Sequence, residues 1–112
     1  MDYSTDKIVL NFYTNYWLTL ENYPEAISTF EQLLEIEELR EDTRLRTLRS
    51  LGQLTAAEER WRDSIRYYEL WREASLEEDD VVYRGLSYAH YQVDELAEAL
   101  PYWIAYMELS LI

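Results

Sequence analysis

Apolar side chains recur every three or four residues along most of this 112-residue chain, with charged residues between them. This spacing gathers the apolar positions on one face of an α-helix instead of alternating them across a strand. It predicts helices over residues 8–20, 24–39, 43–58, 61–76 and 81–92, and a sixth from residue 95 to the carboxyl terminus. The chain has two glycines and two prolines, which is little material for the frequent turns of a sheet protein. The pattern therefore predicts an all-α fold of antiparallel helical hairpins.

Polar residues at the breaks in the pattern predict where the helices begin. The expected caps are Asp42 or Thr43 for the third helix, Asp79 or Asp80 for the fifth and Asp94 for the sixth. Pro24 suits the first turn of the second helix, where its missing N–H is not needed. Pro101 lies beyond the first turn of the sixth helix and meets the carbonyl of Ala97, so we expect a kink or a loosened turn there.

Three stretches of the chain can be aligned at a spacing of about 35 to 38 residues. The shared steps hold Leu10, Tyr13, Thr14, Tyr23, Ala26, Ile27, Phe30 and Leu33 in the first; Leu48, Leu51, Gly52, Trp61, Ile65, Tyr68 and Trp71 in the second; and Tyr83, Leu86, Ser87, Leu96, Ala99, Leu100, Trp103 and Tyr106 in the third. The units cover about residues 7–40, 45–78 and 80–112 of a single domain spanning residues 1–112. A repeat of this length predicts helix pairs stacked as a solenoid.

These units resemble the tetratricopeptide repeat family, most clearly over residues 48–71. Leu51 and Gly52 lie where the two helices of a hairpin pack closely, and Ser64 stands at the small position that Ala26 and Ala99 fill in the other units. The resemblance implies three antiparallel hairpins in a short right-handed solenoid. It also implies that a protein or peptide binds in a concave groove lined by the first helix of each hairpin.

Carried over step by step, the family's groove positions are mostly polar in this chain. They are Asn11, Asn15, Arg46, Arg49, Gln53, Arg84, Tyr88 and Gln92, with Ile8, Leu18, Ala56 and Val81 beside them. Arginine pairs with carboxylates through two parallel hydrogen bonds, and Asn and Gln can hold backbone amides. We expect this groove to bind an extended segment with acidic side chains or a terminal carboxylate. The alternative is that these arginines pair internally with the many Glu and Asp residues.

A subgroup of the family grips the carboxyl-terminal tails of heat-shock chaperones with Lys, Asn and Arg residues. Only Asn15 matches that set, while Asn11, Val81 and Gly85 stand where gripping groups would be expected. We therefore predict that this chain does not form that clamp.

Composition and charge exclude several classes of function. A net charge of −13 and a pI near 4.3 oppose nucleic acid and anionic membranes, which require basic surfaces. The chain has no cysteine, and its carboxylate runs lack the spacing of a calcium loop. We interpret His90, the single histidine, and the tryptophans and tyrosines as packing residues. No catalytic residues, metal site or cofactor are predicted, so we do not expect an enzyme.

The apolar run over residues 8–20 is interrupted by Asn11, Thr14 and Asn15 and is too short to span a bilayer, so membrane insertion is not predicted. The acidic amino terminus does not resemble a signal peptide. The expected location is the cytoplasm, and the periplasm if the chain is trimmed from a longer exported protein.

The last predicted helix is unusually apolar. Residues that we expect to form an interface are Tyr102, Trp103, Tyr106, Met107 and Ile112. Terminal repeats need a polar face or a capping helix. Either a capping helix has been removed, or this face packs against a second copy or an obligate partner.

Two functions are consistent with these patterns. The first is a non-enzymatic adaptor that binds an extended or acidic protein segment in the concave groove. The alternative is a small acidic chaperone that shields an apolar partner or forms a homo-oligomer through its last helix. Salt dependence distinguishes them, because exposed charge pairs weaken in salt whereas apolar burial does not.

Overall fold

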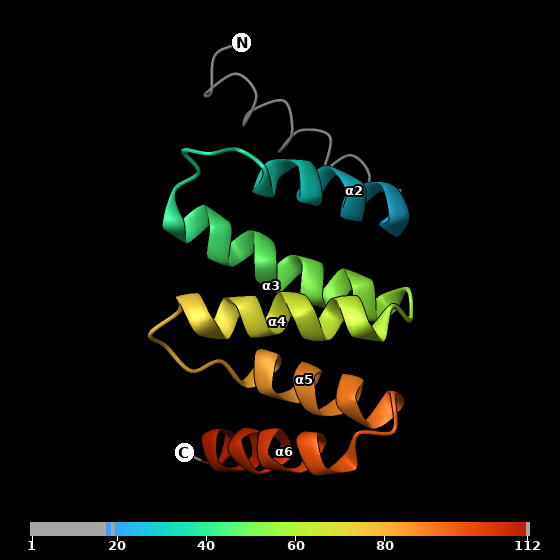
Figure 1. The fold of residues 1–112 in the computed structure, drawn as a ribbon, viewed down its shortest axis with the longest axis vertical. Helices are drawn as coiled ribbons and strands as arrows, with labels where there is room; N and C mark the ends of the chain where they lie inside the picture. Colours follow the sequence, from blue (N-terminus) through green and yellow to red (C-terminus); the bar gives the residue numbers. More distant parts are fainter. Residues whose placement is uncertain (1–17, 19, 112) are drawn as a thin grey trace.

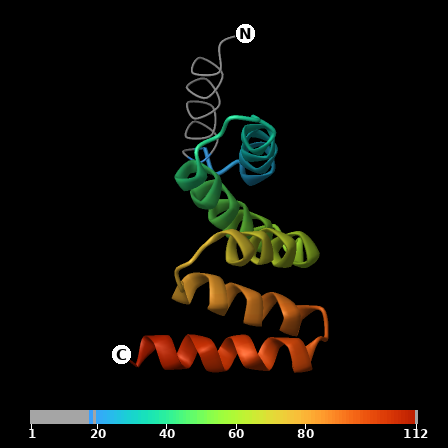
Figure 2. The same ribbon diagram turned by 60° about the vertical axis from the view of Figure 1, so that its left-hand side comes forward.

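The structure is a computed structural model that describes residue 18 and residues 20–111. Its helices are α2 (Tyr23–Leu34), α3 (Glu41–Ala57), α4 (Trp61–Ala74), α5 (Asp80–Gln92) and α6 (Leu96–Ser110), and no strand occurs in this part of the chain. They stack one after another in chain order, with α2 at one end and α6 at the other (Figures 1 and 2). The predicted all-α class is confirmed. The helix expected over residues 8–20 lies outside the described residues.

The turns inside the hairpins repeat with the spacing seen in the sequence. Glu21, Glu59 and Asp94 all have positive φ, between 56° and 62°, and stand 38 and 35 residues apart. In the last two turns the next amide donates back to a helical carbonyl oxygen over 2.8 Å. A residue in the left-handed backbone conformation therefore reverses the chain at each of these turns, although none of the three residues is a glycine.

The predicted end of α2 and the predicted beginning of α3 are both wrong by a few residues. The helix expected to reach residue 39 ends at Leu34, because a run of carboxylates is unfavourable at the negative end of the helix dipole. The third helix begins at Glu41, so Arg40 precedes it where Asp42 or Thr43 was expected. An acidic residue is favourable inside the first turn as well as before it, and Asp42 takes that place.

The predicted cap of α5 is confirmed, whereas the predicted cap of α6 is wrong. Asp79 caps α5 as predicted, accepting from the amides of Val81 and Val82 over 2.8 and 3.3 Å. The prediction for α6 is wrong, since Asp94 takes the left-handed turn conformation and Glu95 precedes the helix. Helix α6 continues through Pro101, and the kink or loosened turn expected there stays a prediction.

The core is centred on α3, α4 and α5, and Tyr68 of α4 lies in its middle. Its ring sits between the two glycines of the chain, Gly52 on α3 and Gly85 on α5. A Cβ atom at Gly52 would stand 2.5 Å from the ring, so the close approach of these helices depends on having no side chain there. The Ser64 hydroxyl donates to the Gly52 carbonyl over 2.7 Å and satisfies a buried polar group.

Candidate functional site

A groove of about 830 Å³ runs between α5 and α6. Its lining is mainly apolar and comprises Arg84, Gly85, Ser87, Tyr88, Tyr91, Leu96, Ala99, Leu100 and Trp103. Pockets that bind ligands are concave, mainly apolar and typically about 300–1,000 Å³ in volume. This groove has the size and lining to receive side chains from another molecule.

The α6 side of the groove exposes large apolar side chains. Leu96 is 63% exposed, Leu100 59% and Trp103 45%, and Ala99 is the only α6 residue that is fully buried. Helix α6 packs mainly on α5 and touches α4 only through its inward side, at Tyr102, so its outward face has no cover within the described part of the chain. Contiguous apolar surface of this kind marks an interaction site.

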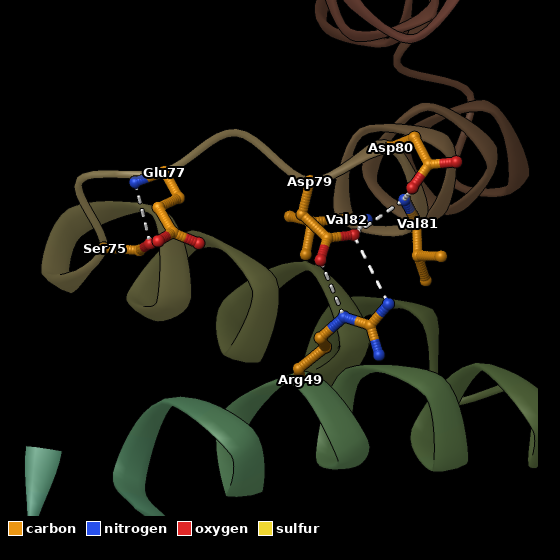
Figure 3. A network of polar contacts seen from close by, with 7 residues as sticks. All are labelled: Arg49, Ser75, Glu77, Asp79, Asp80, Val81 and Val82. Carbon is orange, nitrogen blue, oxygen red and sulfur yellow. Dashed lines mark hydrogen bonds and ion pairs between the residues drawn. The ribbon is translucent and has the colours of Figure 1, made fainter. Parts of the chain in front are cut away.

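Arg84 is the only residue of the lining that is charged at neutral pH. It is exposed and forms no ion pair with a carboxylate of the described residues. Arg49, two helices earlier in the stack, is instead held by Asp79 through bonds of 3.0 and 3.4 Å (Figure 3). The groove thus combines an apolar floor with a single available cation.

The predicted concave-groove residues divide into two sets. Arg84 and Tyr88 line the α5/α6 groove, whereas Arg46 and Gln53 are exposed on α3 and do not line it. Arg49 is engaged with Asp79, as the internal-pairing alternative anticipated. Gln92 is half-buried near the end of α5 and also lies outside the lining. Asn11 and Asn15 lie outside the described residues.

The predicted interface residues of α6 also divide. Trp103 faces the groove with Tyr106 beside it, their ring centroids 5.3 Å apart, and Met107 is exposed further along the helix. Tyr102 points to the inside of the stack, where Arg72 donates to its hydroxyl over 3.0 Å and the hydroxyl donates to Glu69. Ile112 lies outside the described residues.

Most of the apolar lining of the groove was not predicted from the sequence. Leu96 and Leu100 fill repeat steps that are packed in the middle unit, so the alignment alone assigned them to the core. The signal that identifies Leu96 is the structural role of its counterpart Trp61, which meets Tyr88 of the following helix α5. Tyr91 carried no signal, because its step was not among those shared by the units.

Electrostatics around the groove come from a small polar network at its end. His90 hydrogen-bonds Glu95 over 2.8 Å and Arg62 of α4 donates to the same carboxylate over 3.0 Å. The bond from Arg62 first, and then that from His90, hold the pKa of Glu95 below its usual value. Further in, burial raises the pKa of Tyr68 to about 12, and the charge of Arg49 offsets only part of that rise.

The described residues offer neither a metal site nor a membrane span. No group of three or more His, Cys, Asp or Glu side chains in the described part of the chain is arranged to hold a metal ion. None of the described helices combines the length and the apolar character needed to cross a membrane.

Comparison with solved structures identifies the architecture. The chain superimposes on a structure of MamA AMB-1 with a TM-score of 0.74 and 20% sequence identity, over 91% of this chain and 53% of that one. The fold is a tetratricopeptide-like helical repeat. The chain spans about half the length of the MamA chain that it matches. No protein-family model and no curated protein matches it.

Proposed function

We propose that this chain is a non-enzymatic adaptor that binds a segment of another protein in the α5/α6 groove. The observation that carries the proposal is the exposure of Leu96, Leu100 and Trp103 along one concave surface. Covering apolar area yields about 25 cal/mol per Å², so several such side chains supply the main driving force. Arg84 at the edge of this surface adds a preference for a partner with an acidic group.

The lining chemistry favours binding over catalysis. Apart from Arg84, the ionisable groups of the lining are the tyrosines Tyr88 and Tyr91, and neither is paired with a base in the groove. An aromatic ring with a polar tip is well suited to an interface, because it contributes apolar area and one hydrogen bond. Binding of an extended acidic segment along α3 and α5, near Arg46, stays a prediction from the sequence.

Capture of partners from a native lysate tests the proposal when two leucine variants are compared. Leu100→Glu places a charge on the groove, whereas Leu76→Glu changes a fully exposed leucine in the connector before α5. We expect a partner that the wild type and Leu76→Glu retain and Leu100→Glu loses. If Leu100→Glu retains the same partners as the wild type, the groove is not the binding site.

The chaperone alternative is favoured by a specific feature of α6. Ile104, Met107 and Leu111 are exposed beyond the groove and extend the apolar surface along the helix. A partner shielded by this larger surface would bind through apolar burial. Its capture would then survive high salt, whereas a complex that depends on Arg84 would weaken.

A further inference from the structure

The α5/α6 groove repeats, 35 residues later, a groove that this chain fills itself. Helix α5 packs on both α3 and α4. The positions on those helices that contact α5 include Arg49, Trp61 and Tyr68, and the repeat places Arg84, Leu96 and Trp103 at the same steps. All three of these counterparts line the α5/α6 groove. We call the surface of α3 and α4 on which α5 packs the seat of α5. Its contacts with α5 therefore indicate which kind of helix would fit the α5/α6 groove.

The first contact between the seat and α5 is made at the amino-terminal end of α5. Asp79 caps α5, and the same carboxylate forms paired bonds with Arg49 at 3.0 and 3.4 Å (Figure 3). Arg49 reaches up from α3 to the point where α5 begins. Its counterpart Arg84 lies on α5, with no ion pair to any described carboxylate. A second helix beginning at the same place would bring its capping carboxylate to Arg84.

Two further contacts fix the register along the helix. Gly85, six residues after the cap, lies against the Tyr68 ring so closely that a Cβ atom there would overlap it. Tyr88, nine residues after the cap, meets Trp61 edge to face with centroids 5.4 Å apart. The bound helix thus runs antiparallel to α4, with a small residue at the ring and an aromatic residue beyond it.

Exposure shows that the seat is filled in one repeat and open in the next. Tyr68 is 2% exposed under α5, whereas its counterpart Trp103 is 45% exposed. Trp61 is half-buried and its counterpart Leu96 is exposed. The difference follows from the presence of α5 on the first surface, because the side chains at these steps are large and mainly apolar in both.

We propose that the α5/α6 groove binds an amphipathic α-helix of a partner protein in the register of α5. This helix runs antiparallel to α6 and begins with an acidic capping residue that pairs with Arg84. Three and seven residues later it carries apolar side chains, as α5 does at Val82 and Leu86. Its sixth residue after the cap is Gly, as in α5, and covers Trp103. The inference rests on the proposed function and specifies the partner.

The other described helices of this chain do not fit, which argues against a second copy as the occupant. Arg40 and Arg60 precede α3 and α4 and would repel Arg84. Helix α2 begins after the uncharged Asn22. Helix α6 carries Pro101 six residues after its cap, where a small residue is needed. Helix α5 has the full pattern, but it is already seated in its own chain.

A peptide copy of residues 77–93, with blocked ends, is the probe. It is titrated into the isotope-labelled full chain and followed by NMR, with the Trp103 indole as the reporter. We expect shifts at Trp103, Leu100 and Arg84, and an affinity that falls at least tenfold when the peptide carries Gly85→Leu. The Asp79→Asn peptide keeps a capping side chain but loses the charge.

A double-mutant cycle tests the ion pair. The Asp79→Asn change should weaken binding about threefold to the wild-type chain and leave binding to the Arg84→Ala chain unchanged. Arg46→Ala is the matched control, because Arg46 is an exposed arginine of α3 outside the groove, and it should keep the threefold effect. Equal effects of Asp79→Asn on the wild-type and Arg84→Ala chains would overturn the assigned register.

A short peptide is weakly helical in water, so the same sequence is also joined to the carboxyl terminus through a flexible linker. The linker raises its effective concentration to about the millimolar range. If neither format shifts Trp103, the inference is overturned. If peptides with and without Gly85→Leu bind equally, a helix in this register is excluded while protein binding in the groove stands.

The comparison of peptides with and without Gly85→Leu separates this inference from the proposed function, and two further outcomes bear on both. If Leu100→Glu leaves both lysate partners and peptide binding unchanged, the proposed function fails and the inference fails with it. If sedimentation shows that the chain alone forms a dimer, and Leu100→Glu dissolves it, the occupant is a second copy. That result overturns the partner helix but not the use of the groove.

Discussion

Replacing Gly52 by alanine should destabilise this protein, although alanine is the better helix former. Gly52 lies in the interior of α3, where the exchange alone would stabilise the helix by about 1 kcal/mol. The new Cβ atom, however, would stand 2.5, 2.6 and 2.7 Å from three carbons of the Tyr68 ring. Ordinary van der Waals contact begins at 3.4 Å, so one partner must move by about 0.9 Å.

The ring has little freedom to make this movement. Gly85 approaches its other edge, at Cε2, where a Cβ atom would overlap the ring as well, and Tyr68 is almost completely buried. Overpacking of a core costs about 1–3 kcal/mol, and a ring held on both sides belongs at the upper end. Subtracting the gain in helix propensity leaves a net loss of about 1–2 kcal/mol, or roughly 4–8 °C in melting temperature for a domain of this size.

The assay is thermal and urea unfolding of four chains: wild type, Gly52→Ala, Tyr68→Leu and the double variant. Leucine removes the ring atoms that the methyl group would strike, so Gly52→Ala should stabilise the Tyr68→Leu chain by about 1 kcal/mol. The effect of one substitution therefore changes sign between the two backgrounds. A Gly52→Ala chain that melts above the wild type, or equal effects in both backgrounds, would refute the argument.

Three further predictions concern the cap, alkaline stability and the groove. Asp79→Asn keeps a capping side chain but loses the ion pair, so it should cost under about 1 kcal/mol in urea unfolding, while Asp79→Ala should cost about 1 kcal/mol more; equal losses would contradict the cap. Because the folded pKa of Tyr68 is about 12, above its unfolded value of 10.0, its contribution is complete below pH 10 and is lost as the pH rises through 12. This loss approaches about 2–3 kcal/mol, and a Tyr68→Phe chain should show a flatter decline in the urea midpoint between pH 9 and 12. Leu100→Glu should change stability by less than about 0.5 kcal/mol, because the leucine is exposed, yet reduce the fluorescence of an apolar dye bound to the chain; undiminished dye binding would argue that the groove is not the main apolar surface.

The helices were predictable because a 3.6-residue period needs no distant information. Their ends were less so. The carboxylates at 35, 37 and 38 fit an amphipathic helix pattern. Their combined negative charge would lie at the negative end of the helix dipole, and this explains why α2 ends at Leu34. Asp94 has the chemistry of a cap, but the hairpin needs a left-handed residue at that step, and the turn geometry prevails.

Several residues of the groove were predicted individually, but the sequence did not show that they form one surface. Arg84, Tyr88 and Trp103 were each named, but in two separate surfaces, because the alignment does not show that α5 and α6 leave a groove between them. The pairing of Arg49 with Asp79 joins residues 30 positions apart in the chain. No local pattern distinguishes that arginine from Arg84, whose position one repeat later leaves it without such a partner among the described residues.

The linear order of the stack also governs how the protein opens. Each described helix packs mainly on its neighbours in the chain. The longer connections are the packing of α3 on α5 and the side-chain hydrogen bonds that join α2 with α4 and α4 with α6. Such sequence-local contacts are associated with folding in milliseconds or less, and hydrogen exchange should be slowest in the central helices, which have packing partners on both sides. Helix α6 packs on α5 and is joined to α4 only through side chains such as Tyr102, so its detachment opens the groove and leaves the packing of α3, α4 and α5 in place. A ligand in the groove therefore acts as the missing neighbour of α6, and its occupancy can be read as slower exchange of the α6 amides.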